Sequence, residues 1–352
     1  KDVTGAGEKK TRKPRKAGAG ADAAGGGVGE APHGLDELPA LPDLASVDGA
    51  AAGGAAAGGA GGVAAGVDVE VEQLEEGFAG SRYLATVLAP AQGGATLSNL
   101  LWAMSSLRYR PGEEFFAAFN DQCVRRCDEF TDQGVSNIMF AFANLDLNPG
   151  PSVLDAFVAA AKRAMPEFTA QGVANSAWAW AVLDYWPDSE LIDLYKEKIK
   201  SLDRQQISKL DYVQLFQASY AFEQFSPHGA LMEGELLATS REVWEQISSA
   251  RVTISALHQD VSGALTRMGV PHEIEYLTQD NLFSMDIALR GRKVAIEVDG
   301  PSHFCANKMS ERLGSDRLRE RFLAHKGWNV SLPVSIPVSS SLFRRGDAKT
   351  FG

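Results

Sequence analysis

The chain has 352 residues, with 34 Lys or Arg against 45 Asp or Glu, and a formal net charge of -11. This length has room for two domains or more, and the acidic balance excludes nucleic-acid binding through a globally basic surface. Three scattered cysteines, Cys123, Cys127 and Cys305, do not make a disulfide framework and indicate a reducing compartment. No apolar run is long enough to span a bilayer.

Residues 1–92 have the composition of a disordered segment. They contain Gly/Ala tracts at 17–20 and 49–62 and few large apolar side chains. Such a segment cannot bury enough apolar surface to offset its loss of chain entropy on folding. Its first sixteen residues carry seven Lys or Arg against two acids. We therefore expect 1–92 to be a disordered, low-complexity segment. The chain opens on Lys1, so we also expect its natural start to lie upstream.

A 38-residue period follows this segment. An asparagine recurs at this spacing, at Asn99, Asn137 and Asn175. An aromatic residue three positions further on keeps the same spacing: Trp102, Phe140, Trp178 and Phe216. A fixed period of this size is typical of stacked helical repeats. We therefore predict an α-solenoid of helical-hairpin repeats over residues 93–250.

Each 38-residue unit predicts two helices separated by a Pro/Gly break. The first helices are expected at 100–107, 138–145 and 177–183, each ending in a bulky leucine: Leu107, Leu145 and Leu183. The second helix of the first unit has an apolar stripe at Phe116, Phe119 and Cys123, which indicates one buried face. A fourth, diverged unit from about Leu210 is expected to cap the stack against the next domain.

The pattern Asn-x-x-aromatic-Ala-x-x-x-Leu runs from Asn137 to Leu145 and again from Asn175 to Leu183. It resembles the octotricopeptide repeat, and the resemblance covers roughly 96–225. Members of that family guide RNA maturation, stability or translation in chloroplasts and mitochondria. The resemblance implies that the first helix of each unit lies along an RNA strand.

Two interpretations stay open for the recurring residues. The asparagines either tie each first helix to its neighbour's backbone, because buried amides need partners, or they contact RNA bases. The aromatic residues either belong to the core or stack on bases. The first member of each pair is the structural interpretation and the second the functional one.

From residue 252 the 38-residue period stops and the pattern becomes mixed. We predict a helix at 254–268, strands at 273–277, 283–289 and 293–298, a helix at 315–326 and a strand at 328–332. The order αβββαβ predicts a small α/β domain over 252–337, with a layout similar to restriction-endonuclease-like nucleases. Residues 338–352 are expected to form a flexible tail.

Asp286, Glu297 and Asp299 are the candidate catalytic residues of this domain. Asp286 and Glu297 fall on adjacent predicted strands, where two carboxylates can hold one hard cation such as Mg²⁺ or Mn²⁺. In a nuclease core of this type, however, a lysine occupies the position of Asp299 and supports the attacking water or the developing charge. We therefore expect a degenerate site without a cofactor, with Asp286 and Glu297 as metal ligands only if the domain is a nuclease.

The structural alternative gives these acids other partners. They would cap Gly300 and the turn at Ser302, or form ion pairs with Arg317 and Arg321. In that case the domain binds RNA without cleaving it.

The segment Val294–Phe304 contains the string Glu-Val-Asp-Gly-Pro-Ser-His, and Gly327-Trp328 follows the last predicted helix. Together with that helix, these strings resemble the RAP domain over about 257–337. The RAP domain is an RNA-binding domain at the end of organelle RNA-processing proteins, including octotricopeptide proteins and the FAST-kinase family. The resemblance implies RNA contact by this part of the chain.

The candidate RNA-binding residues combine a local basic path, His303 and the recurring amides. They are Arg290, Arg292, Lys293, His303, Arg317, Arg319, Arg321, Asn99, Asn137 and Asn175.

The leading functional hypothesis is an RNA-binding factor in organelle gene expression. The repeats would select an mRNA or rRNA for processing or stabilisation, and the RAP domain would contact RNA. The expected location is the chloroplast or the mitochondrial matrix, with ribonucleoprotein partners and no membrane association, although no targeting peptide is visible. One alternative is a metal-dependent RNA endonuclease guided by the repeats. The other is a protein-interaction scaffold, because helical solenoids also bind peptides.

Overall fold

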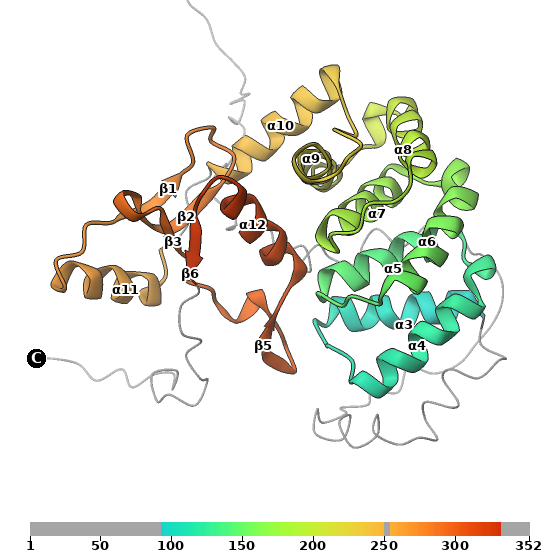
Figure 1. Cartoon of the computed structure of the whole chain (residues 1–352), viewed down its shortest axis with the longest axis horizontal. Coiled ribbons are helices and arrows are strands. Elements are labelled where there is room, and N and C mark those ends of the chain that lie inside the picture. Colours follow the sequence, from blue (N-terminus) through green and yellow to red (C-terminus); the bar gives the residue numbers. More distant parts are fainter. Residues whose placement is uncertain (1–92, 250–253, 332–352) are drawn as a thin grey trace, which may run out of the picture. The chain divides into compact units, whose positions relative to one another are not determined.

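The computed structural model describes residues 93–249 and 254–331 (Figure 1). The first range is helical, and the second combines a small sheet with two helices. This agrees with the predicted fold class of helical hairpins followed by an α/β domain. The predictions for 1–92 and for the tail at 338–352 lie outside the described residues. Among the helices described, none has both the length and the apolar character needed to cross a bilayer.

Four helical hairpins fill residues 93–249. Their first helices are α3 (Gly94–Ser106), α5 (Asp132–Asn144), α7 (Ala170–Val182) and α9 (Lys209–Phe225). Their second helices are α4 (Glu113–Arg125), α6 (Pro151–Ala164), α8 (Ser189–Ser201) and α10 (Gly234–Ser248). Short 3-10 turns lead into the next hairpin: η2 (Cys127–Glu129), η3 (Met165–Glu167) and η4 (Arg204–Gln206). Consecutive first helices lie side by side along the stack (Figure 1).

The 38-residue period is repeated in the backbone itself. Arg108, Asp146 and Asp184 each follow the end of a first helix and have φ values of 53°, 51° and 53°. At each site the next residue donates its backbone N–H to the carbonyl five positions back, as from Leu147 to Phe142 at 2.8 Å. This is a Schellman motif, which satisfies carbonyls that the helix end leaves free. The three hairpins therefore end their first helices in the same way.

The first helices begin six or seven residues earlier than the sequence analysis predicted. Thr131 and Thr169 are the N-caps of α5 and α7, and their hydroxyls accept hydrogen bonds from the backbone N–H groups of Gly134 and Gly172 at 3.2 and 3.1 Å. Capping threonines fix helix starts, and the sequence analysis did not use these two Thr-x-x-Gly strings as helix starts.

Small residues contribute to the core between the first helices. Ala141, Ala143 and Ala179 are fully buried, which lets neighbouring helices approach closely. The predicted leucine column holds at Leu145 and Leu183, which are buried. It fails at Leu107, which is 71% exposed.

The second described range has the predicted αβββαβ order. It consists of α11 (Ala256–Arg267), β1 (Glu273–Leu277), β2 (Ser284–Leu289), β3 (Val294–Ile296), α12 (Gly314–His325) and β6 (Asn329–Ser331). The sheet order is β1-β2-β3-β6, with β6 parallel to β3 and the other neighbours antiparallel. Helix α12 buries Leu318, Phe322 and Leu323.

The sequence analysis missed a small hairpin between β3 and α12. It consists of β4 (Phe304–Cys305) and β5 (Lys308–Arg312), which form a separate two-stranded sheet. These strands are too short and too polar for an alternating apolar pattern to reveal them. Two 3-10 turns, η5 (Arg290–Arg292) and η6 (Pro301–His303), complete the domain.

Candidate functional site

The recurring asparagines do not tie the first helices together. Asn99 is exposed and Asn137 and Asn175 are half-exposed, and within the described residues their side-chain amides have no hydrogen-bond partner. The structural interpretation of this column is therefore wrong for the described part of the chain. One amide that does link two first helices is Asn144, which donates from Nδ2 to Ser105 Oγ at 3.0 Å.

Glutamines extend the asparagine column by one helical turn. Gln133 precedes Asn137 by four residues on α5, and Gln171 precedes Asn175 by four on α7, so each pair shares one helix face. Both glutamines are exposed. We name Asn99, Gln133, Asn137, Gln171 and Asn175 the amide row. The sequence analysis missed the two glutamines, although they follow the same 38-residue spacing.

The aromatic column divides between core and surface. Trp178 and Phe216 are 0% and 3% exposed, whereas Trp102 is 40% exposed. The ring centroids of Phe140 and Trp178 lie 5.6 Å apart, and Trp178 Nε1 donates to Gln217 Oε1 at 2.8 Å. The core interpretation therefore holds for Trp178 and Phe216 but not for Trp102.

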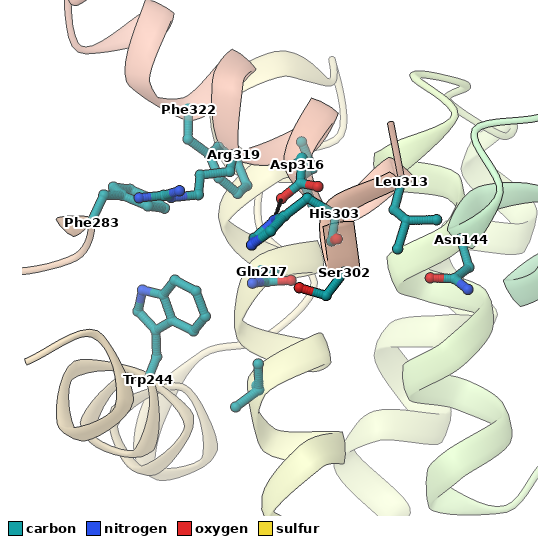
Figure 2. A pocket seen from close by; sticks show the side chains of 13 residues that line it. Asn144, Gln217, Trp244, Phe283, Ser302, His303, Leu313, Asp316, Arg319 and Phe322 are labelled. Atoms are coloured by element: carbon teal, nitrogen blue, oxygen red, sulfur yellow. Dashed lines mark hydrogen bonds and ion pairs between the residues drawn. The ribbon is translucent and has the colours of Figure 1, made fainter. Parts of the chain in front are cut away.

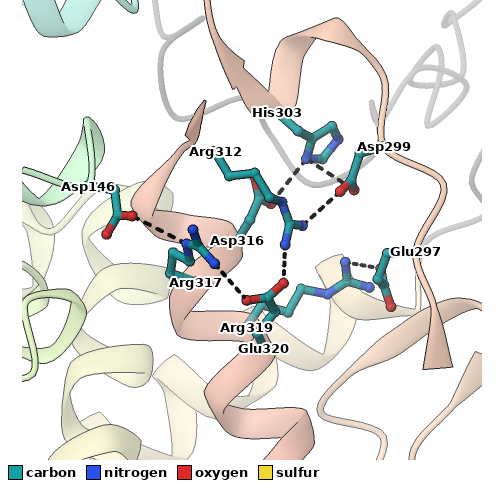
Figure 3. A network of polar contacts seen from close by, with 9 residues as sticks. All are labelled: Asp146, Glu297, Asp299, His303, Arg312, Asp316, Arg317, Arg319 and Glu320. Atoms are coloured by element: carbon teal, nitrogen blue, oxygen red, sulfur yellow. Dashed lines mark hydrogen bonds and ion pairs between the residues drawn. The ribbon is translucent and has the colours of Figure 1, made fainter. Parts of the chain in front are cut away.

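Two of the three candidate acids lie opposite each other on neighbouring strands. Asp286 is on β2 and Glu297 directly follows β3, and the adjacent pairing of Ile287 with Ile296 places them in register. Glu297 is 2% exposed and accepts a hydrogen bond from Arg319 (Figure 3). Burial raises the pKa of Glu297 to about 7, although the Arg319 guanidinium acts in the opposite direction.

Asp299 has an arginine of its own. Arg312 Nη2 lies 2.8 Å from Asp299 Oδ2, and both side chains are 5% exposed. His303 Nδ1 lies 3.8 Å from Asp299 and 3.0 Å from Asp316 (Figure 3). Burial raises the pKa of Asp299, with Arg312 opposing the shift.

The partners of the acids therefore differ from those predicted. Instead of Arg317 and Arg321, Arg319 pairs with Glu297 and Arg312 pairs with Asp299. The reason is helical geometry: consecutive odd positions on α12 point to different sides, so only Arg319 reaches the sheet.

Arg317 and Arg321 instead join α12 to the helical hairpins. Arg317 Nε lies 3.3 Å from Asp146 Oδ2, and Arg321 Nη1 lies 2.8 Å from Asp184 Oδ1. Both aspartates follow the C-terminal ends of first helices, where cations are favourable. The three α12 arginines proposed for RNA binding thus have partners inside the protein.

The remaining cationic candidates lie together at the turn between β2 and β3. Arg290, Arg292 and Lys293 are exposed, and we name them the basic turn. Arg290 lies 3.1 Å from Glu273, and the Lys293 ammonium lies 4.5 Å from the centroid of the Trp328 ring. This group can contact phosphate without breaking a buried ion pair.

A pocket of about 80 Å³ lies where α9 and α10 meet α12 (Figure 2). Trp244, Phe283 and Phe322 line its apolar side, and Gln217 and His303 line its polar side. The pocket is thus enclosed by both described ranges of the chain.

A second set of side chains that could ligate a metal ion shares Asp286 and adds residues from α11 and β1. His258, Glu275 and Asp286 place one ligand atom each within 4.8 Å of one another. The sequence analysis missed His258 and Glu275, because only the tertiary fold brings α11 and β1 to Asp286.

A family model described as the RAP domain matches residues 296–339. The chain contains a RAP domain. The match covers the end of β3, the β4–β5 hairpin, α12 and β6, and it continues past residue 331 beyond the described residues. RAP domains are associated with RNA binding. The matched part includes Glu297, Asp299 and both of their arginine partners.

A chloroplastic RAP domain-containing protein of Oryza sativa subsp. japonica is similar to part of the chain. The two are 36% identical over 76 residues, which cover 22% of this chain and 11% of that protein. The chain thus matches only a small share of the relative. The family match lies outside the helical hairpins, so the octotricopeptide resemblance of 96–225 stays a prediction.

Proposed function

We propose that this protein is an RNA-binding factor in organelle gene expression. In this proposal the helical hairpins select the transcript, and the RAP domain adds contacts and recruits ribonucleoprotein partners. The RAP domain supports the general role in RNA binding. The chloroplastic relative supports an organelle location without separating chloroplast from mitochondrion.

The amide row carries the proposal for the hairpins. Its members are exposed or half-exposed, and their amides have no partner within the described residues. An amide both donates and accepts hydrogen bonds, which suits the edges of unstacked bases in single-stranded RNA. The row recurs on successive helices that lie side by side, so adjacent bases of one strand can meet adjacent helices.

In this proposal, ionic contacts with RNA phosphates contribute less to binding than base contacts do. Residues 96–223 contain 17 acids and 11 Lys or Arg, a net charge of -6. Phosphate contacts then come mainly from the basic turn of the α/β domain. Because each neutralised phosphate of a single strand contributes about -0.7 to the salt slope, we expect a shallow slope with RNA.

The test measures the affinity of the purified full chain for RNA by fluorescence anisotropy. The probe is a single-stranded RNA selected from a randomised pool by the protein itself. We expect the double variant Asn137→Ala/Asn175→Ala to bind about tenfold more weakly or worse, because two base-edge contacts are lost.

The matched control replaces two exposed amides that lie outside the row, Gln205→Ala/Gln259→Ala. This variant should bind the selected RNA like the wild type. Equal affinity of all three proteins would refute base contact by the amide row and favour the protein-interaction scaffold.

The nuclease alternative has less support than RNA binding. Arg319 and Arg312 pair with the carboxylates of Glu297 and Asp299, which leaves fewer free oxygens for a catalytic ion. Incubation of a long RNA with the protein and each divalent ion, compared with Glu297→Ala, tests cleavage directly.

A further inference from the structure

We propose that His258, Glu275 and Asp286 form a binding site for a divalent first-row transition-metal ion. The three side chains come from α11, β1 and β2, and their ligand atoms lie within 4.8 Å of one another. The inference is independent of the proposed RNA binding.

His258 is a buried imidazole with an unpaired nitrogen. The residue is 4% exposed, and its Nε2 atom is buried without a hydrogen-bond partner. Its Nδ1 atom lies 3.4 Å from Glu275 Oε1. A buried polar group without a partner costs free energy, and in native proteins it usually has a ligand, water or ion. A metal ion bound through Nε2 would remove this cost.

Glu275 has a strained backbone that places it in the site. Its φ is 49°, although it lies inside a strand and is not glycine. In the ladder between β1 and β2, Ile274 pairs with Ile287 and Tyr276 pairs with Met285. Glu275 lies between these two pairs and is not itself one of the paired residues. Strain of this kind persists where the surroundings require it, and it clusters at functional sites.

The Glu275 carboxylate, like the His258 imidazole, has a buried polar atom without a hydrogen-bond partner. Its Oε1 atom is buried and has no hydrogen-bond partner. The Asp286 carboxylate lies beside it, with the ligand atoms of the two residues within 4.8 Å of each other. A divalent cation between the two carboxylates would replace their repulsion with attraction.

Asp286 is already oriented by the backbone. One carboxylate oxygen, Oδ2, accepts a hydrogen bond from the Val298 N–H. The other oxygen remains available for an ion. A ligating carboxylate is commonly held in this way by a second hydrogen bond, which fixes its direction toward the metal.

The ligand types decide which ions fit. One imidazole and two carboxylates suit Zn²⁺ or Mn²⁺ better than Mg²⁺ or Ca²⁺, which prefer oxygen ligands alone. Around Zn²⁺ at bond lengths near 2.1 Å, tetrahedral ligand atoms lie about 3.4 Å apart. The three ligand atoms lie within 4.8 Å of one another, so small side-chain rotations bring them to this spacing, and water completes the coordination.

The site would hold α11 on the sheet. His258 is the buried residue of that helix, and Met268 at its end is 73% exposed. The helix thus has few apolar contacts of its own to keep it in place. A metal bridge from α11 to β1 and β2 replaces that missing packing.

The experiment uses the full chain, freed of metal with a chelator and then titrated with Zn²⁺ or Mn²⁺ alone. We expect one ion per chain by calorimetry, a higher Tm and slower hydrogen–deuterium exchange over residues 256–267. His258→Ala should weaken binding at least tenfold and remove the Tm increase.

A second variant keeps the test decisive if His258→Ala fails to fold. Glu275→Gln preserves the size and one acceptor oxygen of the side chain but removes the charge, so it should fold without metal and lose affinity at least tenfold. His272→Ala is the matched control: its imidazole contacts Ser262 and the Val270 carbonyl instead, so metal binding should persist. Unchanged affinity in Glu275→Gln, or no binding by the wild type, would overturn the proposal.

Discussion

At the scale of single residues, the RAP domain concentrates charge in its interior. Glu297 is buried together with Arg319, and Asp299 with Arg312 (Figure 3). Such pairs contribute little net stability, because desolvation of both ions offsets their attraction, but removal of one partner leaves a buried charge. The Glu297 Oε1 atom has no hydrogen-bond partner, so this pair is not fully satisfied.

The raised pKa of Glu297 predicts a pH dependence of stability. The pKa of Glu297 rises from an ordinary 4.5 to about 7 in the folded protein, chiefly through burial. Between these values the folded state binds more protons than the unfolded state, so this group's contribution to stability is lost as the pH rises from 4.5 through 7. Glu297→Gln removes that titration.

We therefore expect Glu297→Gln to gain stability relative to the wild type as the pH rises from 5 to 8. Urea unfolding of both proteins at several pH values measures the difference in free energy. Asp260→Asn, at an exposed acid on α11, is the control and should show no such trend. A difference that stays constant with pH would mean that Glu297 is already ionised throughout this range.

At the scale of elements, the sequence predicts helices and strands better than it predicts which side chains contact each other. The strand at 273–277 is confirmed to the residue, because it is a β-rich run closed by turn residues. The 38-residue period likewise predicts the hairpins. The predicted helix starts were wrong by six or seven residues, since Thr131 and Thr169 were not recognised as N-caps.

Only the part of the candidate site that follows from strand order could be predicted from the sequence. Because Asp286 and Glu297 fall on consecutive predicted strands, they are expected to lie next to each other, and the register confirms this. Glu275 was not predictable, because nothing in its sequence context indicates a left-handed residue inside a strand. Likewise, the choice of Arg319 over Arg317 depends on how α12 rotates against the sheet, which sequence spacing leaves open.

The aromatic column gives a prediction for the hairpins. Trp178 is fully buried and donates a hydrogen bond to Gln217, so Trp178→Ala should lower the free energy of unfolding by about 3 kcal/mol or more. Trp102→Ala, at the equivalent but 40% exposed position, should change it by less than about 1 kcal/mol. Denaturant unfolding of both variants tests this. Equal losses of unfolding free energy in the two variants would mean that Trp102 and Trp178 are equally buried in solution.

At the scale of the whole described molecule, the α/β domain and the hairpins share a junction. Trp244 on α10 donates from Nε1 to the Leu282 carbonyl at 2.6 Å. Phe322 of α12 lies 5.1 Å from Tyr220 and 6.0 Å from Phe225 of α9, between ring centroids. Together with the ion pairs of α12, this packing ties the α/β domain to the last three first helices. The amide row lies nearer the N-terminal ends of its helices, away from these contacts at the C-terminal ends of α5 and α7.

Gly314 allows this close approach of α12. A Cβ atom at this position would collide with the Ala143 carbonyl oxygen and lie 2.6 Å from Val182 Cγ1. Gly314→Ala should therefore push α12 away from α5 and α7, weaken the pairs of Arg317 and Arg321, and lower stability by about 1–3 kcal/mol. Gly291→Ala is the control, because a Cβ there meets no atom within 4 Å. Hydrogen–deuterium exchange should rise at residues 143–146 and 181–184 in Gly314→Ala alone. If exchange there matches the wild type while α12 itself remains protected, the two parts of the chain fold without this contact, and the junction would not position the RAP domain against the hairpins.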